Sequence, residues 1–144
     1  MKILSKILVV FLISGCANSK NVDSSTLVDM LTTANEAYHD ARLNDAETQY
    51  LNITKNYPDY KEAWFKLGNI YARQGRLKAS IRQYERVIQL DSEDGRAWYN
   101  LAIVKVNESK KILTEAGRVL PENSEFILPI NALKAQLNTL SKGR

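Results

Sequence analysis

The chain has 144 residues, a formal net charge of +4 and a single cysteine, Cys16. This length suits one small domain, and a lone cysteine excludes an internal disulfide. Lys2 and Lys6 supply two of the positive charges, so residues 16–144 carry only about +2, which does not favour nucleic acid as a partner.

The first residues have the pattern of an export signal. Lys2 and Lys6 bracket a short positive region, and residues 7–13 form an apolar run. That run is too short to span a bilayer, which takes roughly 20 apolar residues, but it has the length of a signal-peptide core. Residues 13–16 read Ile-Ser-Gly-Cys and resemble a bacterial lipobox.

The lipobox resemblance implies a signal peptide over residues 1–15, cleavage before Cys16, and lipid on that cysteine, palmitate included. Ala17 follows the cysteine where an inner-membrane protein of this kind would carry an aspartate. The resemblance therefore implies a lipid anchor in the outer membrane of a Gram-negative bacterium, facing the periplasm. Residues 16–25 are small and polar, and we expect them to form a flexible tether.

Apolar residues recur at helical spacing through the rest of the chain, so the sequence predicts an all-α domain over residues 26–142. Asn44 and Asp59 are the expected N-caps of the second and third helices, and Gly75 is the expected stop of the third. The predicted helices cover about residues 26–40, 44–57, 59–74, 77–90, 95–119 and 129–140.

A repeat period of about 34 residues, the length of one helical hairpin in a solenoid, connects these helices. It relates Trp64 to Trp98, Leu67 to Leu101, Ala46 to Ser80, and Tyr50 to Tyr84. Small and aromatic residues at a fixed offset of this length indicate stacked helical hairpins, because no single hairpin can bury its apolar face alone.

Residues 64–71 carry the W-x2-L-G-x2-Y pattern of the tetratricopeptide repeat, and the chain resembles that family. The resemblance implies a short solenoid of antiparallel hairpins. Its repeats would cover about residues 27–60 and 61–94, followed by a divergent repeat over 95–121. A final helix over about 129–141 is expected to cap the open end.

The third repeat departs from the pattern after Ala102. No glycine or proline occurs between Ala97 and Ala116, and Pro121 arrives too early for a full repeat. Either the turn is tightened or the two helices are fused. The apolar spacing favours one long helix from about residue 95 to residue 119.

In the tetratricopeptide family the first helix of each hairpin lines a concave groove that holds a protein partner. Carried over position by position, the resemblance implies a groove whose aromatic, amide and cationic side chains suit an extended peptide. These side chains are Asn35, Tyr38, His39, Phe65, Asn69, Arg73, Arg96, Tyr99 and Ile103, with Asn107 beyond them.

Residue types that support catalysis are scarce. His39 is the only histidine, and Cys16 is reserved for lipid, so the chain offers no thiol–imidazole pair and no cysteine–histidine metal cluster. It also lacks a glycine-rich phosphate loop. The sequence therefore predicts no catalytic residues, no metal and no cofactor, and an adaptor rather than an enzyme.

The stretches around Trp64 and Trp98 are similar to those of lipoproteins from tight-adherence (Flp) pilus systems. This implies a membrane-anchored adaptor in the assembly of an envelope machine such as a pilus or a secretion system. The alternative is a scaffold for enzymes of polysaccharide export or cell-wall synthesis. Gene neighbourhood separates the two: pilin and secretin genes favour the first, glycosyltransferase genes the second.

Overall fold

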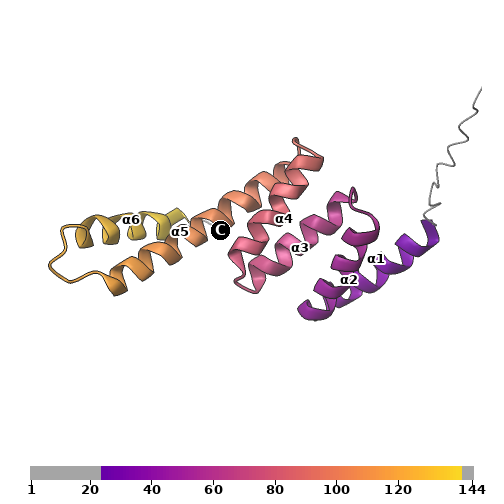
Figure 1. Ribbon diagram of the computed structural model, residues 1–144, viewed down its shortest axis with the longest axis horizontal. Coiled ribbons are helices and arrows are strands. Elements are labelled where there is room, and N and C mark those ends of the chain that lie inside the picture. Colours follow the sequence, from indigo (N-terminus) through magenta and orange to yellow (C-terminus); the bar gives the residue numbers. More distant parts are fainter. Residues whose placement is uncertain (1–23, 141–144) are drawn as a thin grey trace, which may run out of the picture.

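The computed structural model describes residues 24–140 and contains six α-helices in that range (Figure 1). They are α1 (Ser24–His39), α2 (Leu43–Asn56), α3 (Lys61–Arg73), α4 (Leu77–Leu90), α5 (Gly95–Val119) and α6 (Ile127–Leu140). The expected signal peptide, Cys16 and the tether up to residue 23 lie outside the described residues. Ser24 and Ser25, expected in the tether, belong to α1.

Each helix packs against its neighbours in sequence, from α1 on α2 through to α5 on α6. The pairs α1–α2 and α3–α4 are antiparallel hairpins, so the predicted all-α solenoid is confirmed. The predicted N-caps are wrong. α2 and α3 are preceded by Arg42 and Tyr60, neither of which makes a side-chain capping hydrogen bond.

Two groups of buried side chains form the core. One lies among α1, α2 and α3 and includes Tyr50 and Leu67. The other lies among α3, α4 and the first part of α5 and includes Tyr84 and Leu101. Trp64 packs against both groups. Because this side chain bridges them, the hairpins share one continuous interior, as a solenoid requires.

The closest approach of two helices occurs at Gly68 of α3. The hydroxyl of Ser80 donates a buried hydrogen bond to the Gly68 carbonyl, at 2.8 Å. The ring of Tyr84 lies so close that a Cβ atom on Gly68 would stand 2.5 Å from its Cε1 atom. Glycine is therefore required here by space, because any side chain would displace the buried ring.

The two tryptophans repeat one contact. Trp64 Nε1 donates to the carbonyl of Pro58 at 2.8 Å, and Trp98 Nε1 donates to the carbonyl of Ser92 at 2.9 Å. Both acceptors lie in the turn that precedes the helix of the ring, α3 or α5. Trp64 is half-buried and is also covered by Arg86 of α4, whereas Trp98 remains 52% exposed. Among the described residues, no helix follows α5 in the position from which α4 covers Trp64.

The third repeat does not turn at position 109, where the preceding repeats do. Ala41 and Gly75, which occupy the same position in successive repeats, end their hairpin turns with positive φ angles of 58° and 71°. Ser109, one further period along the chain, stays within α5. The absence of glycine does not by itself explain this, because Ala41 adopts the left-handed conformation in the first repeat.

The second helix of the third repeat would carry charge at its inward positions. Ser80, Ile81, Tyr84 and Val87 are the buried positions of α4, and one period later the same positions hold Thr114, Glu115, Arg118 and Pro121. A hairpin built from these residues would bury the charged side chains of Glu115 and Arg118 against α5, at a cost in free energy. The chain continues as one helix over Gly95–Val119, which confirms the favoured long helix.

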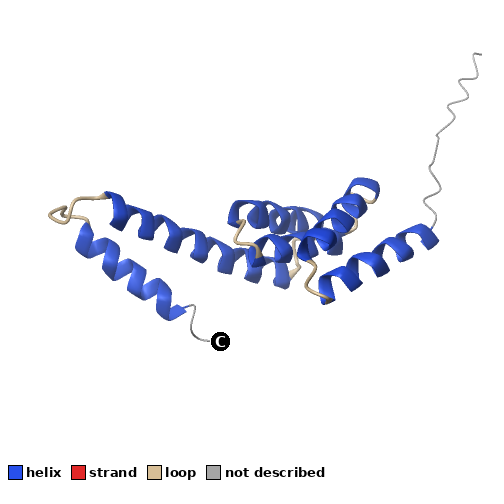
Figure 2. Ribbon diagram, turned by 90° about the horizontal axis from the view of Figure 1, so that it is seen from below, coloured by secondary structure: helices blue, strands red, loops and turns tan. Residues whose placement is uncertain are grey.

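The second half of α5 leaves the body of the molecule, and α6 folds back along it (Figure 2). We call the pair formed by residues 105–140 the extension. Among described residues, α5 has no buried side chain after Val104, and α6 has none. The final helix was expected to cap the open end of the solenoid. It packs against the second half of α5 instead, and Trp98 stays exposed.

The turn between α4 and α5 is held by Asp94. Its buried carboxylate caps α5 by accepting from the backbone N–H groups of Arg96 and Ala97. The Arg96 side chain donates to it at 2.8 Å, and Lys61 of α3 lies 3.3 Å away. The hydrogen bonds from Arg96, with the contribution of Lys61, hold the pKa of Asp94 well below its usual range.

A comparison of two helical glycines tests the close approach at Gly68. Gly68→Ala forces a Cβ into the Tyr84 ring, whereas a Cβ on Gly117 of α5 meets nothing within 4 Å. Both changes gain the same helix propensity, about 1 kcal/mol. Gly68→Ala should therefore be about 1–3 kcal/mol less stable than Gly117→Ala in urea titrations. Equal stabilities would show that α3 and α4 are not in contact at this point.

Removal of the Asp94 carboxylate should destabilise the fold in a pH-dependent way. Asp94→Ala should lower the free energy of unfolding at pH 7 by about 1–2 kcal/mol through loss of the cap. The pKa of Asp94 is lowered in the folded state, so its stabilisation is complete above the unfolded value of about 3.9 and is lost as the pH falls through the folded pKa.

The stability difference between the wild type and Asp94→Ala should thus stay constant from about pH 5 to 8 and narrow progressively below about pH 4. Urea titrations across this range measure it. Asp45→Ala is the matched control, because Asp45 is exposed and pairs only with Arg42, an interaction worth less than about 1 kcal/mol. A difference for Asp94→Ala that widens in acid would contradict the assignment.

Candidate functional site

The first helices of the three repeats, α1, α3 and α5, share one face of the solenoid, which we call the A face. Contacts between their side chains show that they are neighbours: Lys66 of α3 reaches Tyr38 of α1, and Asn100 of α5 reaches Asn69 of α3. The A face holds most of the residues that the sequence predicted for a peptide groove.

Two asparagines of the A face are held by tyrosines from the second helices. Tyr50 donates its hydroxyl to Asn35 Oδ1 at 2.7 Å, and Tyr84 donates to Asn69 Oδ1 at 2.7 Å. The two pairs occupy equivalent positions in successive repeats. Both tyrosines are almost fully buried, and burial raises the pKa of each hydroxyl, so the hydroxyl remains a neutral donor.

This arrangement fixes the orientation of the predicted groove amides. The oxygen of Asn35 and the oxygen of Asn69 serve the fold as acceptors, and Asn69 Oδ1 also accepts from Asn100 Nδ2 at 3.2 Å. The Nδ2 groups of Asn35 and Asn69 remain as donors on a half-buried surface. An amide held in this way offers N–H donors to a peptide carbonyl without a further entropic cost of ordering.

The strongest cationic feature of the A face surrounds Tyr38. Lys66 Nζ lies 4.9 Å from the centre of the Tyr38 ring, and the Arg73 guanidinium carbon lies 5.5 Å from it. Within residues 24–140, neither cation belongs to an ion pair. We call Tyr38, Lys66 and Arg73 the cationic patch. Two uncompensated cations on one aromatic ring present positive charge to a ligand.

Phe65 does not belong to the groove surface, contrary to the sequence prediction. It is buried, packs beside Tyr84 with ring centres 5.8 Å apart, and is part of the second core group. The guanidinium of Arg96 covers its outer side at 4.5 Å. The phenylalanine faces inward because the approach of α5 closes this side of α3.

Arg96 is also committed to the fold. Its guanidinium pairs with Glu62 of α3 at 3.0 Å and with Asp94 at 2.8 Å. The hydrogen bonds that Arg96 donates to these two carboxylates, to Asp94 first, raise the Arg96 pKa above its already high value. Arg96 therefore fastens α5 to α3, and its charge is neutralised before any ligand arrives.

The remaining predicted residues lie at the margins of the A face. Tyr99 is 56% exposed and Ile103 is half-buried on α5, while His39 is exposed at the end of α1 beside Tyr38. Lys66 and Asn100 were not among the groove residues predicted from the sequence. No local signal marked them, because each matters only through a neighbour on another helix. By contrast, Asp94 could have been found as an N-cap residue type just before a helix.

Two further findings concern residues 24–140 as a whole. Residues 24–140 contain no group of three histidine, cysteine, aspartate or glutamate side chains placed to hold a metal ion. None of the helices in this range is both long and apolar enough to cross a membrane. What the A face does present is aromatic area, amide donors and uncompensated positive charge.

Comparison with curated proteins gives partial matches. The human protein O-mannosyl-transferase TMTC3 is 27% identical over 93 residues, which is 65% of this chain and 10% of that protein. The mouse TMTC3 protein is 28% identical over 68 residues, 47% of this chain and 7% of that protein. The chain thus spans about a tenth of the length of the curated relatives that it matches.

Among solved structures, the Yersinia enterocolitica type III secretion translocator chaperone SycD superposes with a TM-score of 0.57 over 84% of this chain and 89% of that one, at 16% identity. This likeness concerns the fold. The family model described as "Tetratricopeptide repeat" matches residues 31–94, the segment that contains α2, α3 and α4 and most of α1. Together with the repeated contacts of the hairpins, this match supports a tetratricopeptide repeat protein whose repeats cover residues 31–94.

Proposed function

We propose that this protein is a non-catalytic adaptor that holds an extended, acidic segment of a partner protein across the A face. The observation that carries the proposal is the cationic patch, in which Lys66 and Arg73 flank Tyr38 without an opposing carboxylate. A bound peptide carboxylate would supply the missing negative charge.

The surroundings of the patch fit a peptide backbone as well as a charge. Asn35 and Asn69 are each anchored by a buried tyrosine through the amide oxygen, so their Nδ2 donors are left for a ligand. Backbone carbonyls of an extended segment accept such donors, while arginine holds a carboxylate through two parallel hydrogen bonds. Amide donors set the register of the segment, and the cations select for acidic side chains or a terminal carboxylate.

We further propose that the adaptor acts at a membrane, in an envelope machine such as a pilus or a secretion system. The support for the anchor is the sequence Ile-Ser-Gly-Cys at residues 13–16, which resembles a lipobox. A tether of about ten residues before α1 would let the A face reach partners near the outer membrane. The support for the envelope machine is the resemblance of the repeats to those of tight-adherence lipoproteins.

The double variant Lys66→Ala/Arg73→Ala tests the binding face. Both side chains end on the exposed side of Tyr38 and form no ion pair within the described residues, so stability should change little. Loss of both cations should weaken retention of the partner at least about tenfold, since each such truncation at an interface can cost about 2 kcal/mol. Co-purification from solubilised membranes with quantitative mass spectrometry measures the retention.

Arg42→Ala/Lys55→Ala is the matched control. It also removes two cations, but from the turn before α2, where Arg42 pairs with the exposed Asp40 and Asp45, and from the exposed surface of α2 at Lys55. The control should retain the partner, and thermal melts should show that both double variants are folded. Equal partner recovery by the two double variants would move the binding surface away from the A face.

The anchor has its own test. Cys16→Ser removes the only thiol in the chain and should abolish incorporation of labelled palmitate together with lipoprotein-type cleavage. The variant should leave the membrane fraction, because several acyl chains supply the anchoring free energy at about 0.8 kcal/mol per buried CH₂. Undiminished labelling of the variant would refute the lipoprotein assignment without affecting the A face.

A further inference from the structure

A groove of about 930 Å³ lies where the extension leaves the body, between the first turn of α4 and the second half of α5. Its floor is apolar, formed by Leu77 and Ala79 on one side and by Ile112, Ala116 and Val119 on the other. Ile112 and Val119 are each 63% exposed. The groove exists because the third repeat does not turn back to place a helix beside α4.

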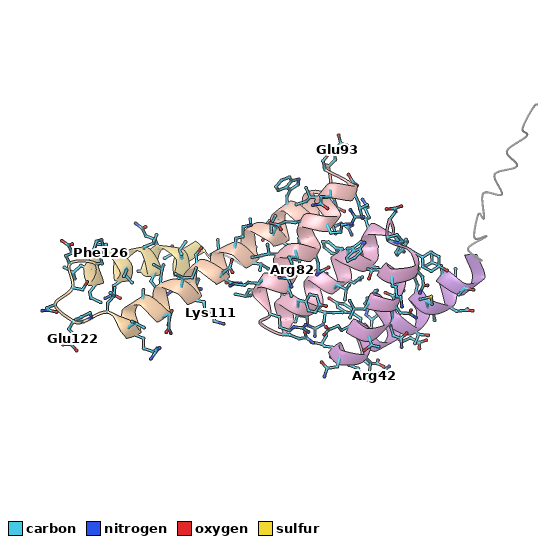
Figure 3. The ribbon with its side chains drawn as sticks, viewed as in Figure 1. Arg42, Arg82, Glu93, Lys111, Glu122 and Phe126 are labelled. Carbon is cyan, nitrogen blue, oxygen red and sulfur yellow. The ribbon has the colours of Figure 1, made fainter. Side chains whose placement is uncertain are left out.

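The rim of the groove is cationic. Lys78 and Arg82 of α4 and Lys111 of α5 line it, and none of the three belongs to an ion pair in the described part of the chain. Figure 3 shows Arg82 and Lys111 at the junction of body and extension. Glu108 and Glu115 also line the groove, but Glu115 is occupied by Arg118.

The far end of the extension has the opposite character. The loop between α5 and α6 carries Glu122 and Glu125, which form no ion pair among residues 24–140, and the adjoining Phe126 and Leu128 are 57% and 80% exposed. We call residues 121–128 the tip. Figure 3 shows Glu122 and Phe126 together there, away from the body. The tip thus presents acidic groups next to exposed apolar ones, and a ligand for the cationic, apolar groove would need both.

The extension is poorly stabilised within one chain. Two helices that cover one another without a buried side chain are marginal in water, because helices depend on the packing of an apolar face. Contiguous exposed apolar residues on an otherwise folded protein mark an interaction surface. We therefore expect another protein surface to cover the exposed apolar residues of the extension, Ile112 and Val119 among them.

We propose that two copies of this chain pair through antiparallel extensions, with the tip of each copy seated in the cationic groove of the other. The occupant of the groove is thus a second copy. The interface is isologous, because a two-fold axis relates the two contacts between the tip of one copy and the groove of the other. This inference does not rest on the proposed function and leaves the A face free.

The dimensions agree with this pairing. From Glu108 at the groove to Val119 before the tip, α5 rises about 16 Å at 1.5 Å per residue. When two such helices run antiparallel about a midpoint near Ile112–Ala116, residue 108 of one copy lies opposite the tip of the other. Ile112, Ala116 and Val119 of the two copies then face each other and cover the stripe that one chain leaves exposed.

Site-specific photo-crosslinking of the full chain in its host membrane tests the proposal. A benzophenone amino acid at position 126, in a mixture of two differently tagged copies, should give a cross-tag adduct. Mass spectrometry should place the other end of the adduct within residues 75–82 or 108–119. The same probe at Leu51, which is exposed on α2, should give no cross-tag adduct.

Charge exchange supplies the second arm. Lys78→Glu/Arg82→Glu sets acid against acid at both contacts and should reduce the cross-tag adduct at least about tenfold. Adding Glu122→Lys/Glu125→Lys in the same chain restores opposite charges and should restore the adduct. All four positions are on the surface, so circular dichroism melts should be unchanged.

A cross-tag adduct that is insensitive to the first exchange, or that maps to another segment, would overturn the proposal. So would an adduct formed only with a different protein, or the absence of any cross-tag adduct from position 126. None of these results would bear on the Lys66→Ala/Arg73→Ala experiment, because the two surfaces share no residue.

Discussion

The packing of Tyr84 on Gly68 is the contact on which the arrangement of this solenoid depends. It sets the distance between α3 and α4, and the hydrogen bond from Ser80 to the Gly68 carbonyl locks the two helices at that distance. The tyrosine hydroxyl also donates a hydrogen bond to Asn69, the next residue of α3. One side chain thus links the hairpin interior to the surface where we place the ligand.

The same requirement explains why the solenoid stops. A further hairpin would need an aromatic residue at position 118 and a small one at position 114, to fill the space beside Ala102. Arg118 and Thr114 cannot form that interior, so α5 continues in a straight line and exposes both Trp98 and its own second half. The groove beside α4 is a direct consequence, since it occupies the place of the helix that does not form.

Two surfaces with different chemistry result from this interruption. The A face lies on the regular repeats, where buried tyrosines hold asparagines and the cationic patch carries charge without opposing carboxylates. The extension lies beyond the repeats and offers an apolar stripe between a cationic groove and an acidic tip. A chain with both surfaces could hold a partner while it pairs with a second copy, and the membrane anchor that we propose would raise the local concentration of both.

The sequence alone determined the all-α class and the limits of most helices to within a few residues. It favoured one long helix over residues 95–119 but left a tightened turn open, and the structure shows the single helix. The repeat period and the helical spacing of apolar residues are local properties of the chain, so they can be read without a structure. The family resemblance, in turn, implied a surface formed by the first helix of each hairpin, and Tyr38, Asn69 and Arg73 lie on two of these helices, α1 and α3.

Only the tertiary structure decided what each of those side chains does. Phe65 and Arg96 share a helical face with Asn69 and Tyr99 in sequence, yet the approach of α5 buries the first and neutralises the second. Lys66 belongs to the site because its ammonium group lies over the ring of Tyr38, a residue on another helix. Periodicity specifies which side of its own helix a residue occupies. Burial, charge pairing and the position of α6 depend on contacts between helices, which one-dimensional spacing does not encode.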